Sequence, residues 1–199
     1  MDERLKQVKE QWNITADSQW YSSLRTDEKI NQLVEQPDKA FHPQVYALLK
    51  KYLPDIKGKK ILLPSSGDNH AAFAFALMGA EVTSADISER QLENAAEIAE
   101  RLQLSIEFVC DNTMELSNIK DDSYDLVYTS NGTHTWITDI KSMYQNICRV
   151  LKKGGYSIMY DIHPFTRPFS CEVWKAPQIT KAYADVLPSC HWRVQDLIN

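Results

Sequence analysis

The sequence predicts an α/β fold in which a parallel sheet is doubly wound, with helices on both of its faces. Short apolar runs alternate with amphipathic helical stretches from about residue 58 to residue 162. All six glycines lie between Gly58 and Gly155, where tight connections between such elements are needed. Because strict alternation of strand and helix joins parallel strands through right-handed crossovers, this pattern favours a doubly wound sheet.

Residues 1–55 are predicted to form an N-terminal helical cap. Leu5, Val8 and Trp12 recur at helical spacing, and a second helix near residue 30 ends before Pro37. Pro43 fits the first turn of a third helix, where its missing N–H costs nothing. The aromatic residues expected to pack within this cap are Trp12, Trp20 and Tyr21.

Residues 56–162 are predicted to contain the sheet, and residues 163–199 a substrate-side loop with a terminal helix, all in one structural domain. The expected strands are 60–63, 81–86, 106–110, 124–129 and 156–161. The expected helices are 71–78, 88–102 and 139–151. Ser88-Glu89-Arg90-Gln91 has the pattern of a capping box at the start of the second of these helices.

Composition narrows the class of protein. The chain has 199 residues, 43% of them hydrophobic, and a net charge of -5, so binding to nucleic acid through phosphate contacts is not expected. A charged N-terminus and the lack of a long apolar run favour a cytoplasmic protein without a membrane partner. Cys171, Cys190 and His191 do not have the spacing of zinc ligands, so no metal site is expected.

Four loops follow the carboxyl ends of the predicted strands, where ligands bind in sheets of this kind: 65–68, 86–88, 111–113 and 130–136. Asp86 follows Gly67 by 19 residues, close to the spacing of a carboxylate that binds a ribose diol. Asp86 could also cap the next helix, and the two roles are compatible. A pyrophosphate is disfavoured as the ligand, because Gly67 is the only glycine of its loop and is followed by the carboxylate of Asp68. A cationic ligand, such as a sulfonium, suits this loop better.

The motifs in these positions resemble those of class I S-adenosylmethionine-dependent methyltransferases, of the small-molecule type with the methyltransferase-11 domain. The resemblance runs from about residue 58 to 162 in five segments that keep the family's order: Lys60–Asn69, Ala80–Ser88, Cys110–Asn112, Tyr124–Tyr128 and Arg149–Gly155. It implies a Rossmann-like core, S-adenosylmethionine as cofactor and S-adenosylhomocysteine as its product.

The resemblance also implies roles for individual residues. The first loop would hold the methionine part of the cofactor, Asp86 the ribose hydroxyls, and Asp111 the adenine amino group. The implied cofactor-binding residues are Ser65, Ser66, Gly67, Asp68, Asp86, Ile87, Asp111, Asn112, Ser130 and Asn131. His134 and His163 lie just beyond the fourth and fifth predicted strands, where a base could act on an acceptor, and are the catalytic candidates.

The chain departs from the family's pattern in several places. The family usually has an acidic residue at the position of Leu63 and glycines at those of Ser65 and Asn69. Its final antiparallel strand pair has no counterpart after residue 190. We therefore expect the fifth strand to lie at the sheet edge, with the chain truncated or the edge covered by another chain, for example in a homo-oligomer.

The leading hypothesis is a methyltransferase that acts on an unidentified small-molecule acceptor. The alternative is a non-catalytic domain that binds S-adenosylmethionine or S-adenosylhomocysteine and acts through a partner, which the departures favour slightly. Methyl transfer onto any acceptor separates the two. A nicotinamide-dependent oxidoreductase is disfavoured, because the sequence has no glycine-rich pyrophosphate loop.

Overall fold

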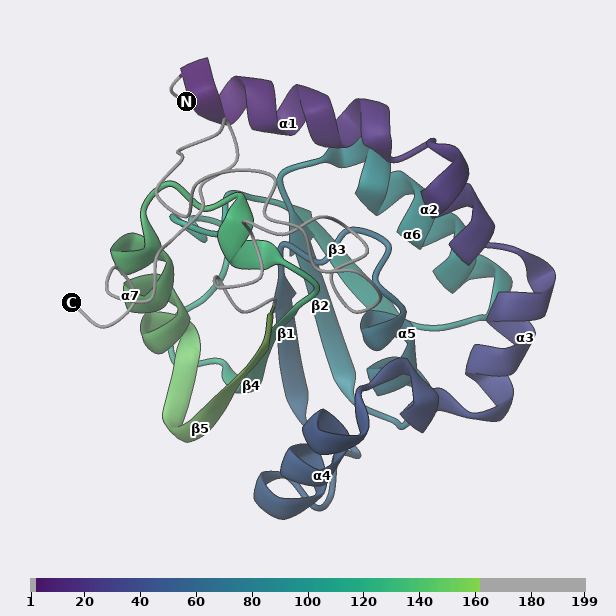
Figure 1. The fold of residues 1–199 in the computed structure, drawn as a ribbon. Coiled ribbons are helices and arrows are strands. Elements are labelled where there is room, and N and C mark those ends of the chain that lie inside the picture. The colour runs from purple at the N-terminus through teal and green to yellow at the C-terminus, as the bar shows by residue number, and fades with distance from the viewer. Residues whose placement is uncertain (1–2, 162–199) are drawn as a thin grey trace, which may run out of the picture.

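Five parallel strands form one sheet in residues 3–161, the part of the chain that the computed structural model describes. They are β1 (Lys60–Pro64), β2 (Glu81–Asp86), β3 (Ile106–Cys110), β4 (Tyr124–Ser130) and β5 (Leu151–Tyr160), in the spatial order β3-β2-β1-β4-β5. The order reverses between β1 and β4, so the carboxyl ends of these neighbours form the topological switch point. The predicted doubly wound parallel sheet is confirmed (Figure 1).

Helices precede the sheet and connect its strands. The N-terminal region contains α1 (Glu3–Thr15), α2 (Gln19–Leu24), α3 (Asp27–Glu35), the 3-10 helix η1 (Pro37–Ala40) and α4 (Pro43–Tyr52). The connections contain α5 (His70–Leu77), α6 (Glu89–Arg101), the short η2 (Thr133–Thr135) and α7 (Ile140–Val150). Figure 1 shows α1 across the top of the molecule and α4 at its base. No helix in residues 3–161 is long and apolar enough to span a membrane.

Alternate residues of the central strands bury their side chains on opposite faces of the sheet. Ile61 and Leu63 of β1 pack in a cluster with α3, α4, α5 and α6. Leu62, between them, packs in a second cluster with α7 and with Leu5 of α1. Because both faces are covered, β1 has the continuous apolar sequence that is typical of a buried parallel strand.

Short polar residues begin most of the helices. Ser18, Thr26 and Asn69 each accept a hydrogen bond from the backbone of the first turn of α2, α3 and α5. Asp139 does the same for α7. These caps satisfy N–H groups that have no partner within the helix, so the helix starts are encoded locally.

Three details differ from the sequence-based expectation. The short elements α2 and η1 were not predicted, because so few residues carry no helical periodicity. Trp20 is 68% exposed, so the prediction that it packs within the cap was wrong. The fifth strand begins at Leu151, directly after α7, and a register shift against β4 precedes the pairing of Leu126 with Tyr156. Within residues 3–161, β5 is an edge strand of the sheet, and that another copy covers it stays a prediction.

Candidate functional site

Asp86, at the carboxyl end of β2, joins two of the loops at this edge of the sheet. Its two carboxylate oxygens accept hydrogen bonds from the N–H groups of Gly67 and Ser88, each at 2.8 Å. Burial raises the pKa of the Asp86 carboxyl to about 6, although these backbone bonds act to lower it. A carboxylate has about four acceptor positions, so two bonds leave capacity for the hydroxyls of a ribose.

The loop after β1 uses backbone conformations that favour glycine. Ser65 and Gly67 have positive φ values of 51° and 52°. The Ser65 hydroxyl lies 2.7 Å from that of Thr113 in the third loop, and the Ser66 hydroxyl contacts that of Ser84 on β2. These bonds hold the first loop against its neighbours and leave its backbone with little side chain around it.

Gly67 packs closely against α6. A Cβ at this position would lie 3.0 Å from the side-chain oxygen of Gln91. That oxygen is buried. In the part of the chain that the structure describes, it is the one buried side-chain nitrogen or oxygen atom that has no hydrogen-bond partner. The approach of the first loop to α6 therefore requires a residue without a side chain.

Ser88 begins α6, but only half of the predicted capping box forms. The Ser88 hydroxyl accepts from the N–H of Gln91 at 3.2 Å, as expected. The reciprocal bond, in which the Ser88 N–H would donate to the Gln91 side-chain oxygen, does not form, because that N–H donates to Asp86. Asp86 thus supports the start of α6 without being its N-cap, which is Ser88.

Asp111, after β3, organises the third loop. Its two oxygens accept from the N–H groups of Asn112 and Asn118, each at 2.7 Å. The backbone N–H of Asn112, one of the implied cofactor-binding residues, is therefore bound within the loop. Asp111 is 8% exposed, and its backbone N–H donates to the carbonyl of Asp86, so the second and third loops are held side by side. The predicted roles of Asp111 and Asn112 toward adenine stay predictions.

The fourth loop contains Ser130, Asn131 and His134. The Ser130 hydroxyl accepts from the Asn69 side chain at 2.8 Å, which connects β4 to the start of α5 across the switch point. Asn131 has a φ of 65°, and its N–H donates to the carbonyl of Tyr160 on β5. His134 is buried, with a ring nitrogen 2.6 Å from Asp161 and the other 2.8 Å from the Tyr144 hydroxyl.

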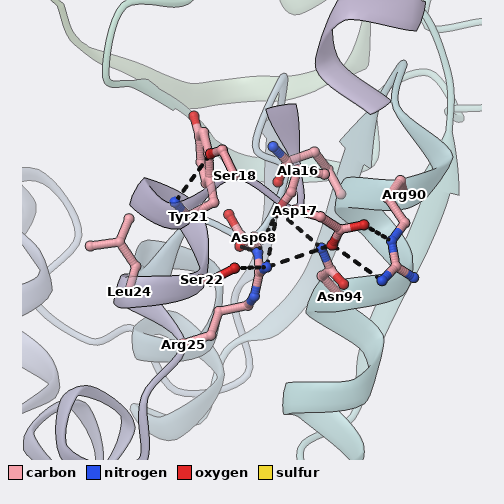
Figure 2. Close-up of polar contacts among 12 residues, drawn as sticks. Ala16, Asp17, Ser18, Tyr21, Ser22, Leu24, Arg25, Asp68, Arg90 and Asn94 are labelled. Atoms are coloured by element: carbon pink, nitrogen blue, oxygen red, sulfur yellow. Dashed lines mark hydrogen bonds and ion pairs between the residues drawn. The ribbon is translucent and has the colours of Figure 1, made fainter. Parts of the chain in front are cut away.

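The N-terminal region supplies a cation to the first loop. Arg25, which follows α2, donates to Asp68 at 2.6 Å, and the two side chains are only 16% and 5% exposed (Figure 2). Arg25 also donates to the carbonyl of Ala16. Burial raises the pKa of the Asp68 carboxyl, while Arg25 acts to lower it. The carboxylate that we expected to face a cationic ligand is therefore paired with a cation of the chain itself.

Further polar contacts hold the N-terminal region on α6. Asp17 binds the guanidinium of Arg90 through both oxygens, and Asn94 donates to Asp17 (Figure 2). Asn13 accepts from the Ser88 hydroxyl, two residues beyond Asp86. The helical cap is thus attached at the loops after β1 and β2.

Aromatic rings extend this cover toward the fourth loop. Trp12 packs edge-on against Tyr21, with centroids 6.0 Å apart, and against Trp136, 5.1 Å apart. Burial raises the pKa of Tyr21 to about 12, and the charges of Asp68 and Asp86 add to the effect. Residues 12–25 thus contact the first, second and fourth loops.

The structure brings the predicted cofactor-binding residues together at one edge of the sheet. The sequence did not identify Arg25, Gln91 and Tyr144 as residues of this site. The partner of Arg25 is 43 residues away in the sequence, and Gln91 and Tyr144 look like ordinary helix residues. The other catalytic candidate, His163, lies outside the described residues, as do Cys171, Cys190, His191 and the rest of the predicted substrate-side loop and terminal helix, 163–199.

Comparison with known proteins connects this site to a family. Residues 63–159 match the methyltransferase domain family model. YbaJ of Bacillus subtilis (strain 168), an uncharacterized methyltransferase, is 32% identical over 124 residues, which are 62% of this chain and 48% of that protein. A relative from Geobacillus sp. (strain WCH70) is 29% identical over 147 residues, 72% of this chain and 55% of its own length. The chain thus spans about half the length of these curated relatives.

Solved structures share the fold. A protein from Pyrococcus horikoshii OT3 superposes with a TM-score of 0.56 at 23% identity, over 76% of this chain and 66% of its own. TehB from Haemophilus influenzae superposes with a TM-score of 0.53 at 22% identity, over 70% of this chain and 43% of its own. At these identities, the likeness establishes the fold alone.

Proposed function

We propose that the protein is a class I S-adenosylmethionine-dependent methyltransferase, since residues 63–159 match the methyltransferase domain, and that it transfers a methyl group from S-adenosylmethionine to a small-molecule acceptor. The observation that carries this proposal is the Asp86 carboxylate, buried where the first two loops meet and bonded to both. S-adenosylmethionine combines a ribose diol, which a carboxylate binds well, with a cationic sulfonium. It has no pyrophosphate, whose binding would need the glycine-rich loop that this sequence lacks.

The described residues fit this cofactor. Asp86 would accept from the ribose hydroxyls, and the first loop, 65–68, would lie against the methionine part. Asp111, Ile87 and Asn112 would surround the adenine, with Ser130 and Asn131 beside the sulfonium. When bound, the cofactor supplies an activated methyl group, and the protein then mainly provides alignment and the exclusion of water.

Calorimetric titration with S-adenosylhomocysteine tests the cofactor site. We expect one-to-one binding, and we expect Asp86→Asn to weaken it at least about tenfold, because a buried polar contact to a hydroxyl is worth about 1.5 kcal/mol or more when charged. Asp55→Asn is the matched control, since Asp55 is exposed and bonds only to the backbone of Lys57 in its own turn. Nicotinamide adenine dinucleotide should not bind. A folded protein that does not bind S-adenosylhomocysteine would overturn the proposal.

Methyl transfer is tested separately from binding. The full chain is incubated with methyl-labelled S-adenosylmethionine and small acceptors that each carry one kind of nucleophile: a phenol, an amine, a thiol or a carboxylate. We expect labelled product from at least one of them. Binding without transfer to any acceptor would favour the non-catalytic alternative.

A further inference from the structure

Three side chains from separate elements form a hydrogen-bonded chain at the carboxyl edge of the sheet. His134 comes from η2 after β4, Tyr144 from the second turn of α7, and Asp161 directly follows β5. His134 Nδ1 lies 2.6 Å from Asp161 Oδ2, and His134 Nε2 lies 2.8 Å from the Tyr144 hydroxyl. The backbone N–H of His134 donates to the same Asp161 oxygen at 3.0 Å.

The chemistry of these groups sets the direction of the hydrogen bonds. An ionised carboxylate can only accept, so Nδ1 of His134 carries the proton and donates it to Asp161. In the neutral ring, Nε2 then accepts from the Tyr144 hydroxyl. Both ring nitrogens of His134 are therefore engaged within the protein, whereas the Tyr144 oxygen keeps capacity to accept a further hydrogen bond.

The position and protonation of Tyr144 fit a role at the acceptor side. Ser130, four residues before His134, bonds to Asn69 next to Asp68, so the chain of bonds adjoins the proposed cofactor site. Tyr144 is half-buried, while the side chains of His134 and Asp161 are 11% and 6% exposed. Burial and the charge of Asp161 raise the pKa of Tyr144, which keeps its hydroxyl protonated at neutral pH.

We propose that Tyr144 is the residue that receives the proton of the methyl acceptor, with His134 and Asp161 as positioning residues that act through it. This inference rests on the proposed function and narrows the acceptor to small molecules with a weakly acidic O–H or N–H group. His134, the catalytic candidate from the sequence, would then act through Tyr144 rather than touch the acceptor.

The proposed step balances in protons and electrons. A lone pair of the acceptor oxygen or nitrogen forms the bond to the methyl carbon, and the electron pair of the broken sulfur–carbon bond stays on sulfur. The acceptor's proton passes to the Tyr144 oxygen as the phenolic proton of Tyr144 passes to Nε2 of His134. The resulting imidazolium is stabilised by the Asp161 carboxylate and later loses its proton to water.

Nitrogen-15 NMR of the histidine-labelled full chain tests the arrangement without an acceptor. We expect His134 to carry its proton on Nδ1, both free and with S-adenosylhomocysteine bound. Tyr144→Phe should shift the Nε2 resonance of His134. The matched control Tyr52→Phe, at the exposed last residue of α4, should not. A proton on Nε2, or no shift in Tyr144→Phe, would overturn the proposed relay.

Methyl transfer to two phenols tests the role in the reaction. 4-Methylphenol is neutral at neutral pH, whereas pentafluorophenol is already ionised and has no proton to give. We expect Tyr144→Phe to lower kcat about 100-fold or more on 4-methylphenol, the usual contribution of general base catalysis, and to leave kcat on pentafluorophenol within about threefold. KM should be nearly unchanged for both phenols.

The possible failures are distinguishable. Equal losses of kcat on the two phenols in Tyr144→Phe would assign Tyr144 a structural role and overturn the inference. A wild-type protein that binds S-adenosylhomocysteine but methylates neither phenol would also overturn it. Loss of S-adenosylhomocysteine binding by the folded wild type would instead overturn the proposed function. Calorimetry on Tyr144→Phe should give the affinity of the wild type, because Tyr144 lies outside the proposed cofactor contacts.

Discussion

Arg25 and Asp68, 43 residues apart in the sequence, form an ion pair at 2.6 Å that is largely shielded from solvent. The pair connects the end of α2 to the first loop of the sheet edge. Asp68 gains a partner for a charge that would otherwise be buried alone, and Arg25 also binds the carbonyl of Ala16. This contact therefore fixes the N-terminal region over the proposed cofactor site.

Removal of the Arg25 side chain should destabilise the protein. In Arg25→Ala, Asp68 remains buried without its cation, and breaking such a pair typically costs about 3 kcal/mol. The free energy of unfolding, from urea denaturation at neutral pH, measures the loss. Arg101→Ala is the matched control, because its pair with Asp27 is exposed on both sides and should be worth less than about 1 kcal/mol. Similar losses in the two variants would contradict the shielded character of the pair.

The buried Asp86 carboxyl should make the protein less stable as pH rises. Its pKa is about 6 in the folded protein against an ordinary value of 3.8, so between these values the folded state holds a proton that the unfolded state has lost. The stability from this group is present in full below pH 3.8 and is lost as the pH rises to about 6, by roughly 3 kcal/mol.

Asp86→Asn isolates this contribution from other carboxyls, such as Asp125, whose lowered pKa acts in the opposite direction. The stability of the wild type minus that of the variant is measured by urea denaturation in steps from pH 4 to pH 7. This difference should fall as pH rises. A difference that stays constant or grows would show that Asp86 is not a carboxyl with a raised pKa.

Gly67→Ala should cost more than Gly58→Ala. Both glycines have positive φ values, 52° and 70°, so both substitutions carry a conformational cost of about 1 kcal/mol. The new Cβ at Gly67 would also meet Gln91 at 3.0 Å, whereas nothing lies within 4 Å at Gly58. We expect a loss of about 2–3 kcal/mol at Gly67, because overpacking adds to the strain, and weaker binding of S-adenosylhomocysteine in that variant alone. Thermal unfolding and calorimetry measure the two effects, and equal losses would contradict the close packing.

Gln103→Gly should stabilise the protein. Gln103 is exposed, follows the end of α6 with a φ of 54°, and its N–H donates to the carbonyl of Glu100. Glycine adopts this left-handed conformation without strain, so we expect a gain of about 0.5–1 kcal/mol in the free energy of unfolding. Gln103→Ala is the comparison, since it removes the side chain and keeps the strain. A gain of the same size in both variants would exclude the backbone as the cause.

Local patterns predicted the sheet and much of the first two loops. The 19-residue spacing of Gly67 and Asp86 indicated a carboxylate at the loop edge of the sheet, and Asp86 lies there, where it accepts from the Gly67 N–H; its role toward a ribose stays a prediction. This worked because a strand, a helix and a second parallel strand return the chain to the same edge at a nearly fixed spacing. Ser88 was identifiable as a helix start for a similar reason, since an N-cap bonds within its own turn.

Contacts between distant segments could not be predicted in this way. The short α2 has no buried residue and no apolar period, so nothing in its sequence indicates that Arg25 reaches Asp68. The prediction of a complete capping box failed for a related reason, because the Ser88 N–H donates to Asp86 instead of to Gln91. Tyr144 is one aromatic residue on an amphipathic helix, and only the folded chain places it beside His134 and Asp161.

Apart from the packing of Leu5 and of Trp12 against Trp136, the α1–α2 segment is attached to the rest of the protein largely by polar and charged contacts. α1 and the residue after it bury only Leu5 and Ala16, and α2 buries nothing. The pairs Lys9–Glu89 and Asp17–Arg90 are partly or largely exposed, whereas Arg25–Asp68 is shielded. Dissolved ions weaken exposed pairs much more than shielded ones. Ionic strength therefore selects among these ion pairs, and in concentrated salt Arg25–Asp68 at the first loop is the pair that persists.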